Sequence, residues 1–150
     1  FEITNVFRKR YSEKGIYENS IYDGIKGLLE RLSSSGVKLC VATSKPQIYT
    51  DKILESFEIR KYFDIVVGSD LEGKFCDKSD IIARAIELGG YDKAGCIMVG
   101  DRKYDIIGAK KNGIKSMAVL YGYGNKEEFV LSGADFIAEK VENIYELALF

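Results

Sequence analysis

The chain has 150 residues, about the length of one globular domain, and it contains no histidine. Histidine general bases, histidine triads and histidine-bearing zinc sites are therefore excluded. Lys and Arg total 22 against 23 Asp and Glu, so the formal net charge of −1 gives no reason to expect nucleic acid or an anionic membrane as a partner.

The cysteines and the apolar runs exclude two further classes of protein. Cys40, Cys76 and Cys96 are odd in number and widely spaced, which argues against a disulfide framework and a four-cysteine metal site. Cys40 and Cys96 lie in apolar runs and are expected in the core, as small buried hydrophobes. No apolar run reaches the roughly 18 residues of a membrane span, and the N-terminus lacks the pattern of a secretory signal. We therefore expect a cytoplasmic protein.

The first part of the chain predicts two helices. Apolar side chains in residues 2–14 recur at intervals of three and four, which predicts a helix that Gly15 ends. After an irregular stretch, Ile25, Leu28, Leu29 and Leu32 share one helical face, with Asp23 as a candidate N-cap and Gly36 as the stop. The apolar positions of the first helix are Ile3, Val6, Phe7 and Tyr11.

From residue 37 onward, short apolar strands alternate with helices. Strands are predicted at 37–42, 63–67, 96–99 and 116–120, with a weaker one at 135–137. Helices are predicted at 46–57, 79–88, 104–112 and 141–149. Continuously apolar strands separated by helices indicate a parallel sheet covered on both faces, which is a doubly wound α/β fold.

Binding residues in such a sheet gather at the carboxyl ends of the strands. Thr43 and Ser44 follow the first strand, and the helix after them would point its early backbone N–H groups at the same spot, which makes a candidate anion site. The alternative is that Ser44 only caps that helix. Lys78 opens the next helix, where the helix dipole disfavours a cation, so it suggests a nearby anion. Its alternative is a solvated surface lysine.

The segment from Gly100 to Asp105 is the most specific local feature. Asp101 and Asp105 straddle a strand-end turn and the first turn of a helix, so both carboxylates fall near one site. Oxygen ligands of this kind suit magnesium, which typically takes one or two carboxylates together with water and substrate phosphate. The alternative is an Asp that caps the helix and a second Asp that favours its dipole.

Two other motifs are set aside. Gly122-Tyr123-Gly124 follows a strand, but Glu127 stands where the third glycine of a dinucleotide motif belongs. Asp70-Leu71-Glu72-Gly73 is similar to an acidic phosphatase nucleophile motif. It follows the second strand and lacks a second aspartate, so it is interpreted as a surface turn.

Taken together, three segments resemble the haloacid-dehalogenase-like hydrolase superfamily, whose second, third and fourth motifs they match in order. They are Ala42 to Pro46, Lys78 to Ile82, and Val99 to Asp105 with Gly108-Ala109. Gly68 to Leu71 and Leu120 to Gly124 are similar to the phosphoglycolate phosphatase and bacterial 5'-nucleotidase group.

The resemblance implies a role for each matching residue. Thr43 and the backbone N–H of Ser44 would bind the substrate phosphoryl group, and Lys78 would neutralise charge there. Asp101 would ligate Mg²⁺, and Asp105 would support the metal or Lys78. The implied reaction is hydrolysis of a small phosphomonoester, such as phosphoglycolate, a nucleotide or a sugar phosphate, through an aspartyl-phosphate, which needs no histidine.

The family's first motif, Asp-x-Asp-Gly-Thr, is absent from the chain. In relatives it ends a central strand and supplies the nucleophile and the general acid/base. Residues 1–20 then look like the last cap helix and its linker, and residues 21–150 like a Rossmann-like core without its first strand. We expect a further N-terminal segment that carries the motif and most of the helical cap, and negligible turnover from residues 1–150 alone.

Two other functions stay open at this point. One is a non-catalytic relative that keeps the phosphate and magnesium pocket as a regulatory or interaction module. The other is a phosphoacceptor receiver domain, which shares the doubly wound plan but needs an acidic pair near its N-terminus and an acceptor Asp on a middle strand. Neither of those features is found here, so the receiver interpretation fits less well.

Overall fold

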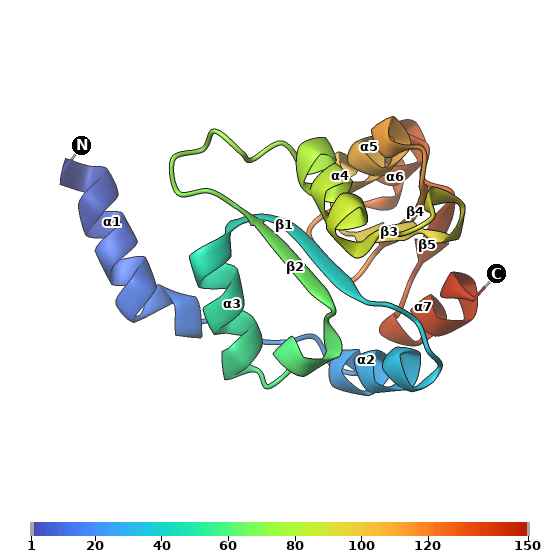
Figure 1. The fold of residues 1–150 in the computed structure, drawn as a ribbon, viewed down its shortest axis with the longest axis horizontal. Helices are drawn as coiled ribbons and strands as arrows, with labels where there is room; N and C mark the ends of the chain where they lie inside the picture. Colours follow the sequence, from blue (N-terminus) through green and yellow to red (C-terminus); the bar gives the residue numbers. More distant parts are fainter. Residues whose placement is uncertain (1, 150) are drawn as a thin grey trace.

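Five strands, divided between two parallel sheets, form the centre of the computed structural model, which describes residues 2–149, with side chains from residue 8 onward (Figure 1). The first sheet pairs β1 (Cys40–Pro46) with β2 (Ile65–Ser69). The second sheet has the order β3-β4-β5, formed by Ile97–Gly100, Lys115–Val119 and Phe136–Ala138. Every pairing is parallel, as the α/β interpretation of the sequence predicted.

The helices connect these strands and cover the sheets. Their bounds are α1 Glu2–Glu13, α2 Ile25–Ser34, α3 Gln47–Ser56, α4 Lys78–Gly89, α5 Lys103–Asn112, α6 Lys126–Ser132 and α7 Val141–Ala148. Short 3-10 turns occur at Gly15–Tyr17, Arg60–Tyr62 and Lys93–Gly95.

Successive strand residues point to opposite faces, which divides the core into two layers. On one face, Met117 and Val119 of β4 pack with Ile144 of α7, and the side chains of α2 and α3 complete this layer. On the other face, Ala118 packs in one cluster with Ile106 of α5 and Phe129 of α6, and α4 covers the first sheet. Helices on both faces of parallel strands make the fold doubly wound.

A groove of about 390 Å³ separates the two sheets. Residues of β1 line one wall and residues of β3 line the other, while α2 and α7 contribute Leu28, Leu29 and Ile144. Within residues 2–149, β1 pairs only with β2 and β3 pairs only with β4. The two strand edges that border the groove therefore have no strand partner in the described part of the chain.

The structure corrects several predicted boundaries. The first strand was predicted at 37–42 but runs from Cys40 to Pro46, because Val37 belongs to the turn that follows α2. Gly24, with φ of 85°, occupies the N-cap of α2, so the prediction of Asp23 there is wrong. Helix α6 was not predicted. Its N-cap is Asn125, whose side chain accepts the Glu128 N–H, and its seven residues are too few for a clear periodic pattern.

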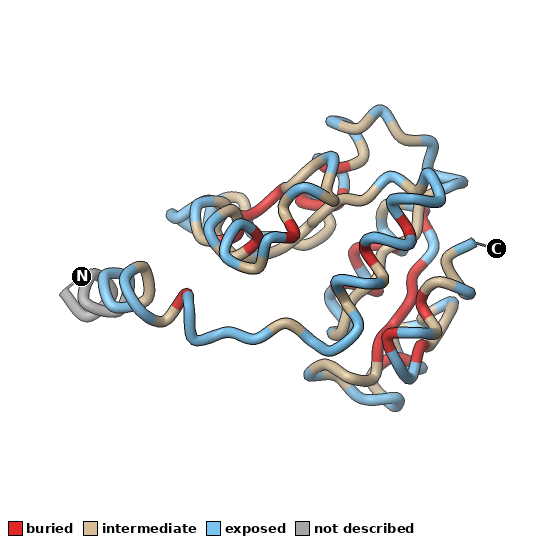
Figure 2. Tube along the Cα trace, turned by 90° about the horizontal axis from the view of Figure 1, so that it is seen from below, coloured by how far each residue is buried: buried red, intermediate tan, exposed pale blue. Residues whose placement is uncertain are grey.

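Helix α1 projects from the body of the molecule, and the connection from it to α2 is mostly exposed (Figures 1 and 2). The buried Ile16 follows α1, and Tyr11 packs edge-on against Tyr49 of α3, with ring centroids 5.1 Å apart. The predicted apolar positions Ile3, Val6 and Phe7 lie outside the described side chains. Helix α1 is therefore attached to the core at its carboxyl end.

The cysteines are less buried than the sequence predicted. Cys40 and Cys96 are half-buried and Cys76 is exposed, and all three are free thiols. Cys40 borders the groove, which leaves its side chain incompletely covered. Burial raises the pKa of both the Cys40 and the Cys96 thiol.

Candidate functional site

A pocket of about 470 Å³ opens at the carboxyl edge of the strands. It lies where the segment after β1, the N-terminus of α4 and the N-terminus of α5 meet. The pocket brings together all five residues that the sequence predicted for the site: Thr43, Ser44, Lys78, Asp101 and Asp105.

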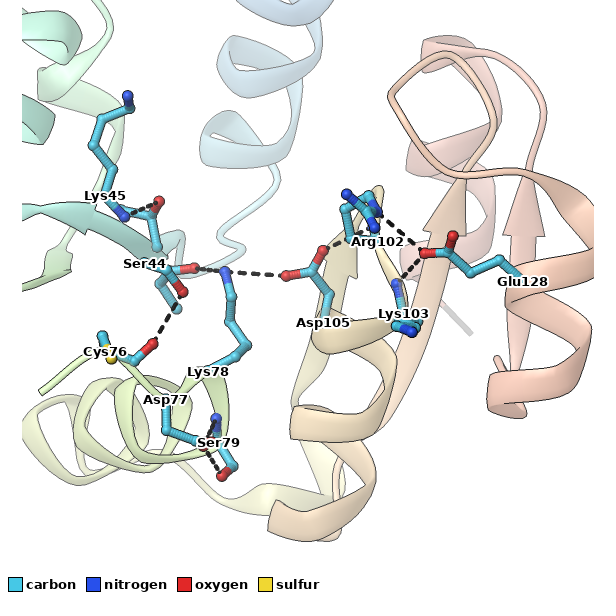
Figure 3. Close-up of polar contacts among 12 residues, drawn as sticks. Ser44, Lys45, Cys76, Asp77, Lys78, Ser79, Arg102, Lys103, Asp105 and Glu128 are labelled. Atoms are coloured by element: carbon cyan, nitrogen blue, oxygen red, sulfur yellow. Dashed lines mark hydrogen bonds and ion pairs between the residues drawn. The ribbon is translucent and has the colours of Figure 1, made fainter. Parts of the chain in front are cut away.

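An ion pair between Lys78 and Asp105 forms the buried part of this pocket (Figure 3). Lys78 Nζ lies 3.0 Å from Asp105 Oδ1, and the two side chains are 15% and 8% exposed. The same ammonium donates to the backbone carbonyl of Ala42, at 3.0 Å. Lys78 is therefore not a solvated surface lysine, and it connects α4 to both β1 and α5.

Asp105 is held by its backbone surroundings as well as by Lys78. Its second oxygen, Oδ2, accepts the Arg102 N–H at 3.1 Å, so the carboxylate satisfies one of the open N–H groups at the start of α5. A Cβ built on Gly100 would lie 2.3 Å from the Asp105 carboxyl carbon. Only glycine therefore leaves room for Asp105 at the end of β3.

Asp101 is fixed by the segment from Gly122 to Gly124, for which the sequence analysis rejected a dinucleotide-binding role. Its Oδ2 accepts the Tyr123 N–H at 3.0 Å, and its backbone carbonyl accepts the Gly124 N–H at 2.8 Å. A Cβ on Gly122 would lie 2.3 Å from Asp101 Cβ. The Gly-Tyr-Gly segment thus does not act as a dinucleotide-binding loop. It packs against Asp101 and orients this residue through backbone hydrogen bonds. The signal available in the sequence was its position directly after a strand.

Thr43 and Ser44 form the β1 side of the pocket. The Thr43 Oγ1 accepts the Lys45 N–H at 3.2 Å, which leaves its hydroxyl proton available for a ligand. Ser44 does not cap α3, because Pro46 occupies the N-cap position. Its hydroxyl donates to the Cys76 carbonyl at 3.2 Å, so it holds the loop before α4 close to β1.

The acidic turn at 70–73 is a surface turn, as the sequence indicated. The Asp70 carboxylate accepts the N–H groups of Lys74 and Phe75, at 3.0 and 2.9 Å. Asp70 is outside the residues that line the pocket. Its side chain closes its own loop and has no place in the site.

The oxygens around Asp101 fit a hard cation such as magnesium. Both oxygens of Asp105 are engaged by Lys78 and the Arg102 N–H, whereas Asp101 uses one of its two oxygens. No cluster of three or more potential metal-ligating side chains occurs among the described residues. One carboxylate, water and substrate oxygens are a usual set for magnesium, which keeps several waters when it binds to proteins.

The rim beyond Asp101 carries a second charged contact. Arg102 Nε lies 3.2 Å from Glu128 Oε1, which also accepts the Lys103 N–H at 2.7 Å. The Lys103 N–H bond, followed by the interaction with Arg102, lowers the pKa of Glu128. Tyr121 lines the groove between the two sheets, and burial raises its pKa to about 12.

The fold and the pocket define a doubly wound α/β protein with a charged site at the carboxyl edge of its strands. The family comparison agrees, since residues 2–119 match the haloacid dehalogenase-like hydrolase family. The chain belongs to that family, as the sequence motifs indicated. No helix in the described part of the chain is long and apolar enough to cross a membrane.

Curated relatives carry names from phosphoryl chemistry. A 5'-nucleotidase of Pseudomonas aeruginosa is 38% identical over 85% of this chain and 58% of its own length. A tyrosine-protein kinase, PtkA of Mycobacterium tuberculosis, is 35% identical over 94% of this chain and 48% of its own length. A phosphoglycolate phosphatase of Aquifex aeolicus is 31% identical over 95% of this chain and 68% of its own length. Two of these names are those of the group that the sequence resembled.

A solved structure gives the same result for the fold. The crystal structure of a predicted phosphatase from Clostridium acetobutylicum matches with a TM-score of 0.94 and 42% identity, over 97% of this chain and 68% of the other. The chain spans 58% and 48% of the lengths of the 5'-nucleotidase and the kinase.

Proposed function

We propose that residues 1–150 form the larger part of the catalytic domain of a magnesium-dependent phosphatase that hydrolyses a small phosphomonoester. The observation that carries this proposal is the buried Lys78–Asp105 ion pair beside Thr43 and Asp101. A lysine held at the carboxyl edge of a parallel sheet, and oriented by a carboxylate, is suited to binding a phosphate dianion.

Each residue of the pocket has a part in this function. The Thr43 hydroxyl and the Ser44 backbone N–H would donate to phosphoryl oxygens. Lys78 would neutralise the charge that builds on the phosphoryl group and on an attacking carboxylate. Asp105 would keep the Lys78 ammonium aimed into the pocket, through the 3.0 Å contact.

Asp101, with support from Asp105, would hold magnesium through the carboxylate oxygen that no backbone N–H occupies. When bound, the ion would supply positive charge next to the phosphoryl oxygens. Gly122 and the Tyr123 N–H have a separate task, because they hold the Asp101 carboxylate at one orientation.

The nucleophile would come from a segment outside residues 1–150. The groove between β1 and β3 supports this part of the proposal, since it is apolar and is bordered by two strand edges without strand partners in the described residues. A parallel strand there would pair with both edges and end between Thr43 and Asp101. An aspartate at that end would attack phosphorus, the ester P–O bond would break, and water would then hydrolyse the aspartyl-phosphate.

In this arrangement residues 1–20 are the end of a helical cap and its linker, and residues 21–150 are the core. The attachment of α1 through Tyr11 and Tyr49, next to the pocket, supports the assignment. A measured mass and sequence of the natural protein test it. A protein consisting of this chain alone, with full phosphatase activity, would contradict the proposal.

The experiment that tests the function is Asp101→Asn in the full-length protein. Magnesium-dependent hydrolysis of an aryl phosphate should fall at least about a hundredfold, because an amide cannot supply the charge that holds the cation. The circular dichroism spectrum and the unfolding midpoint should stay close to those of the wild type. Undiminished hydrolysis would refute the role of Asp101.

The second candidate function is a non-catalytic module that binds phosphate and magnesium in the same pocket. A titration of the wild-type protein with inorganic phosphate and magnesium separates the two, when it is combined with the hydrolysis assay. Binding without hydrolysis by the full-length protein would favour the module. Binding together with magnesium-dependent turnover would favour the phosphatase.

A further inference from the structure

The cations that line the pocket differ in their partners. Lys78 is paired with Asp105, and Arg102 is paired with Glu128. Lys45 of β1 and Lys111 of α5 also line the pocket, and neither makes an ion pair with a carboxylate among the described side chains. One positive charge on the β1 side of the pocket therefore has no anionic partner of its own in the described part of the protein.

Lys45 is held in place by aromatic groups. Its Nζ donates to the Tyr11 hydroxyl at 2.5 Å and lies 5.0 Å from the centre of the Tyr11 ring. Tyr11 in turn packs edge-on against Tyr49. The neutral Tyr11 phenol accepts a hydrogen bond from one of the three N–H groups of the Lys45 ammonium. The half-buried Lys45 therefore has two further N–H donors for another group.

The position of Lys45 relates it to the phosphoryl site. Its backbone N–H bonds to Thr43 Oγ1, so the two residues share one tight turn of backbone. Its side chain runs away from the Lys78–Asp105 pair and toward α1 (Figure 3). A ligand whose phosphoryl group lies against Thr43 and Lys78 would meet the Lys45 ammonium if its leaving group extends along the β1 side of the pocket toward α1.

We propose that Lys45 is a specificity-determining residue that binds a second anionic group, carried by the alcohol part of the substrate. This inference rests on the proposed phosphatase function and narrows its substrate class to short phosphomonoesters with a carboxylate or a second phosphate. A half-buried ammonium beside a phenol has lost part of its hydration, and a charge-assisted bond to an anion restores that interaction. Tyr11 is the positioning residue for this contact.

Matched substrates test the proposal in the full-length protein. Phosphoglycolate and ethyl phosphate have the same ester and the same two-carbon length, but only phosphoglycolate carries a carboxylate. Lys45→Met should lower kcat/KM for phosphoglycolate by about thirtyfold, the effect of one bond between charged groups, and change ethyl phosphate by less than about threefold. Lys45→Arg should recover much of the loss.

A second pair of substrates identifies the anion. The bisphosphate and the monophosphate of 1,3-propanediol are compared in the same way, so that a selective loss on the bisphosphate assigns Lys45 to a second phosphate. Tyr11→Phe should give a smaller loss with the same selectivity, because the ammonium remains but is no longer held. Lys52→Met, an exposed lysine of α3 that lines none of the described pockets, is the control for the loss of one charge.

The possible outcomes separate this proposal from the proposed function. Equal losses on both members of each pair would overturn the specificity role and assign Lys45 to the phosphoryl group or to the fold. Unchanged kinetics of Lys45→Met would overturn it as well. If the wild type hydrolyses no monoester, the phosphatase proposal fails. Calorimetric binding of phosphoglycolate against ethyl phosphate then decides the Lys45 contact without turnover, and equal affinities would overturn it.

Discussion

The two sheets contribute differently to the same pocket. The β1–β2 sheet brings Thr43, Ser44 and, through α4, the cation Lys78, whereas the β3–β4–β5 sheet brings the carboxylates Asp101 and Asp105. The side of the pocket that comes from the β1–β2 sheet and α4 is thus suited to binding an anion, and the side that comes from the β3–β4–β5 sheet is suited to binding a cation. Opposite charges meet in one place only because the two sheets are held side by side.

The two sheets are connected by polar contacts at the pocket and by the packing of α4 against α5, where the Asn112 side chain also donates to the Ser79 carbonyl at 2.8 Å. At the carboxyl edge, Lys78 bridges the two sides of the pocket through Asp105 and the Ala42 carbonyl. Below it, Ile82 of α4 packs with Ala109 of α5, while the strand edges themselves face each other across the groove. The pocket is therefore built by contacts between helices and between side chains, and not by hydrogen bonds between β1 and β3.

Lys78→Met should have the largest effect on stability. The substitution removes the ammonium and leaves Asp105, which is 8% exposed, with an unpaired charge, so the free energy of unfolding should fall by about 3–5 kcal/mol. Urea denaturation measures this loss. Lys38→Met is the matched control, because the Lys38–Asp64 pair is 67% and 38% exposed and should contribute less than about 1 kcal/mol. Equal effects of the two substitutions would mean that the buried pair does not connect the two sides of the pocket.

Gly100→Ala should have the second largest effect on stability, and it disturbs only the side of the pocket that carries Asp101 and Asp105. The new methyl group would overlap the Asp105 carboxyl carbon at 2.3 Å, and the forced shift should cost about 1–3 kcal/mol. Gly27→Ala in α2 is the control, since its Cβ would meet nothing within 4 Å and alanine favours a helix by about 0.5–1 kcal/mol. Thermal unfolding of both variants should show shifts of opposite sign. A neutral Gly100→Ala would show that Asp105 can move freely.

Glu128→Gln should have the smallest effect on stability. The effect can be recognised by its dependence on pH. The pKa of Glu128 is lowered in the folded state, so its stabilising contribution is present above the unfolded pKa of about 4.3 and is lost as the pH falls through the lower folded pKa. The variant should therefore be less stable than the wild type at pH 7, and the difference should shrink in acid. The unfolding midpoint between pH 3 and 7 measures this.

The neighbouring Glu127 supplies the control for that experiment. Its side chain is exposed and makes no hydrogen bond to another described residue, so Glu127→Gln should leave the pH profile unchanged. A profile of Glu128→Gln parallel to that of the wild type would contradict the assigned cause of the pKa shift.

Much of the fold could be predicted because the strands are short, apolar and regularly separated by helices. Boundaries were less predictable where tertiary contacts decide them. Strand β1 continues through Thr43 to Pro46 because Pro46 pairs with Ser69 of β2, a contact that no local pattern contains. The role of Gly122 to Gly124 in holding Asp101 was not predicted, for a similar reason. A glycine required by a close approach to Asp101 has the same appearance in sequence as one required by a turn.

The sequence by itself determined the class of fold, the absence of histidine chemistry, and the identity of the charged residues at the strand ends. These follow from periodicity, composition and position relative to each strand, which are local properties. Only the tertiary structure decided that Lys78 lies against Asp105, that Lys45 lies against Tyr11, and that an apolar groove separates the two sheets. Each of these joins residues far apart in the chain, and their meeting depends on how whole helices and strands pack.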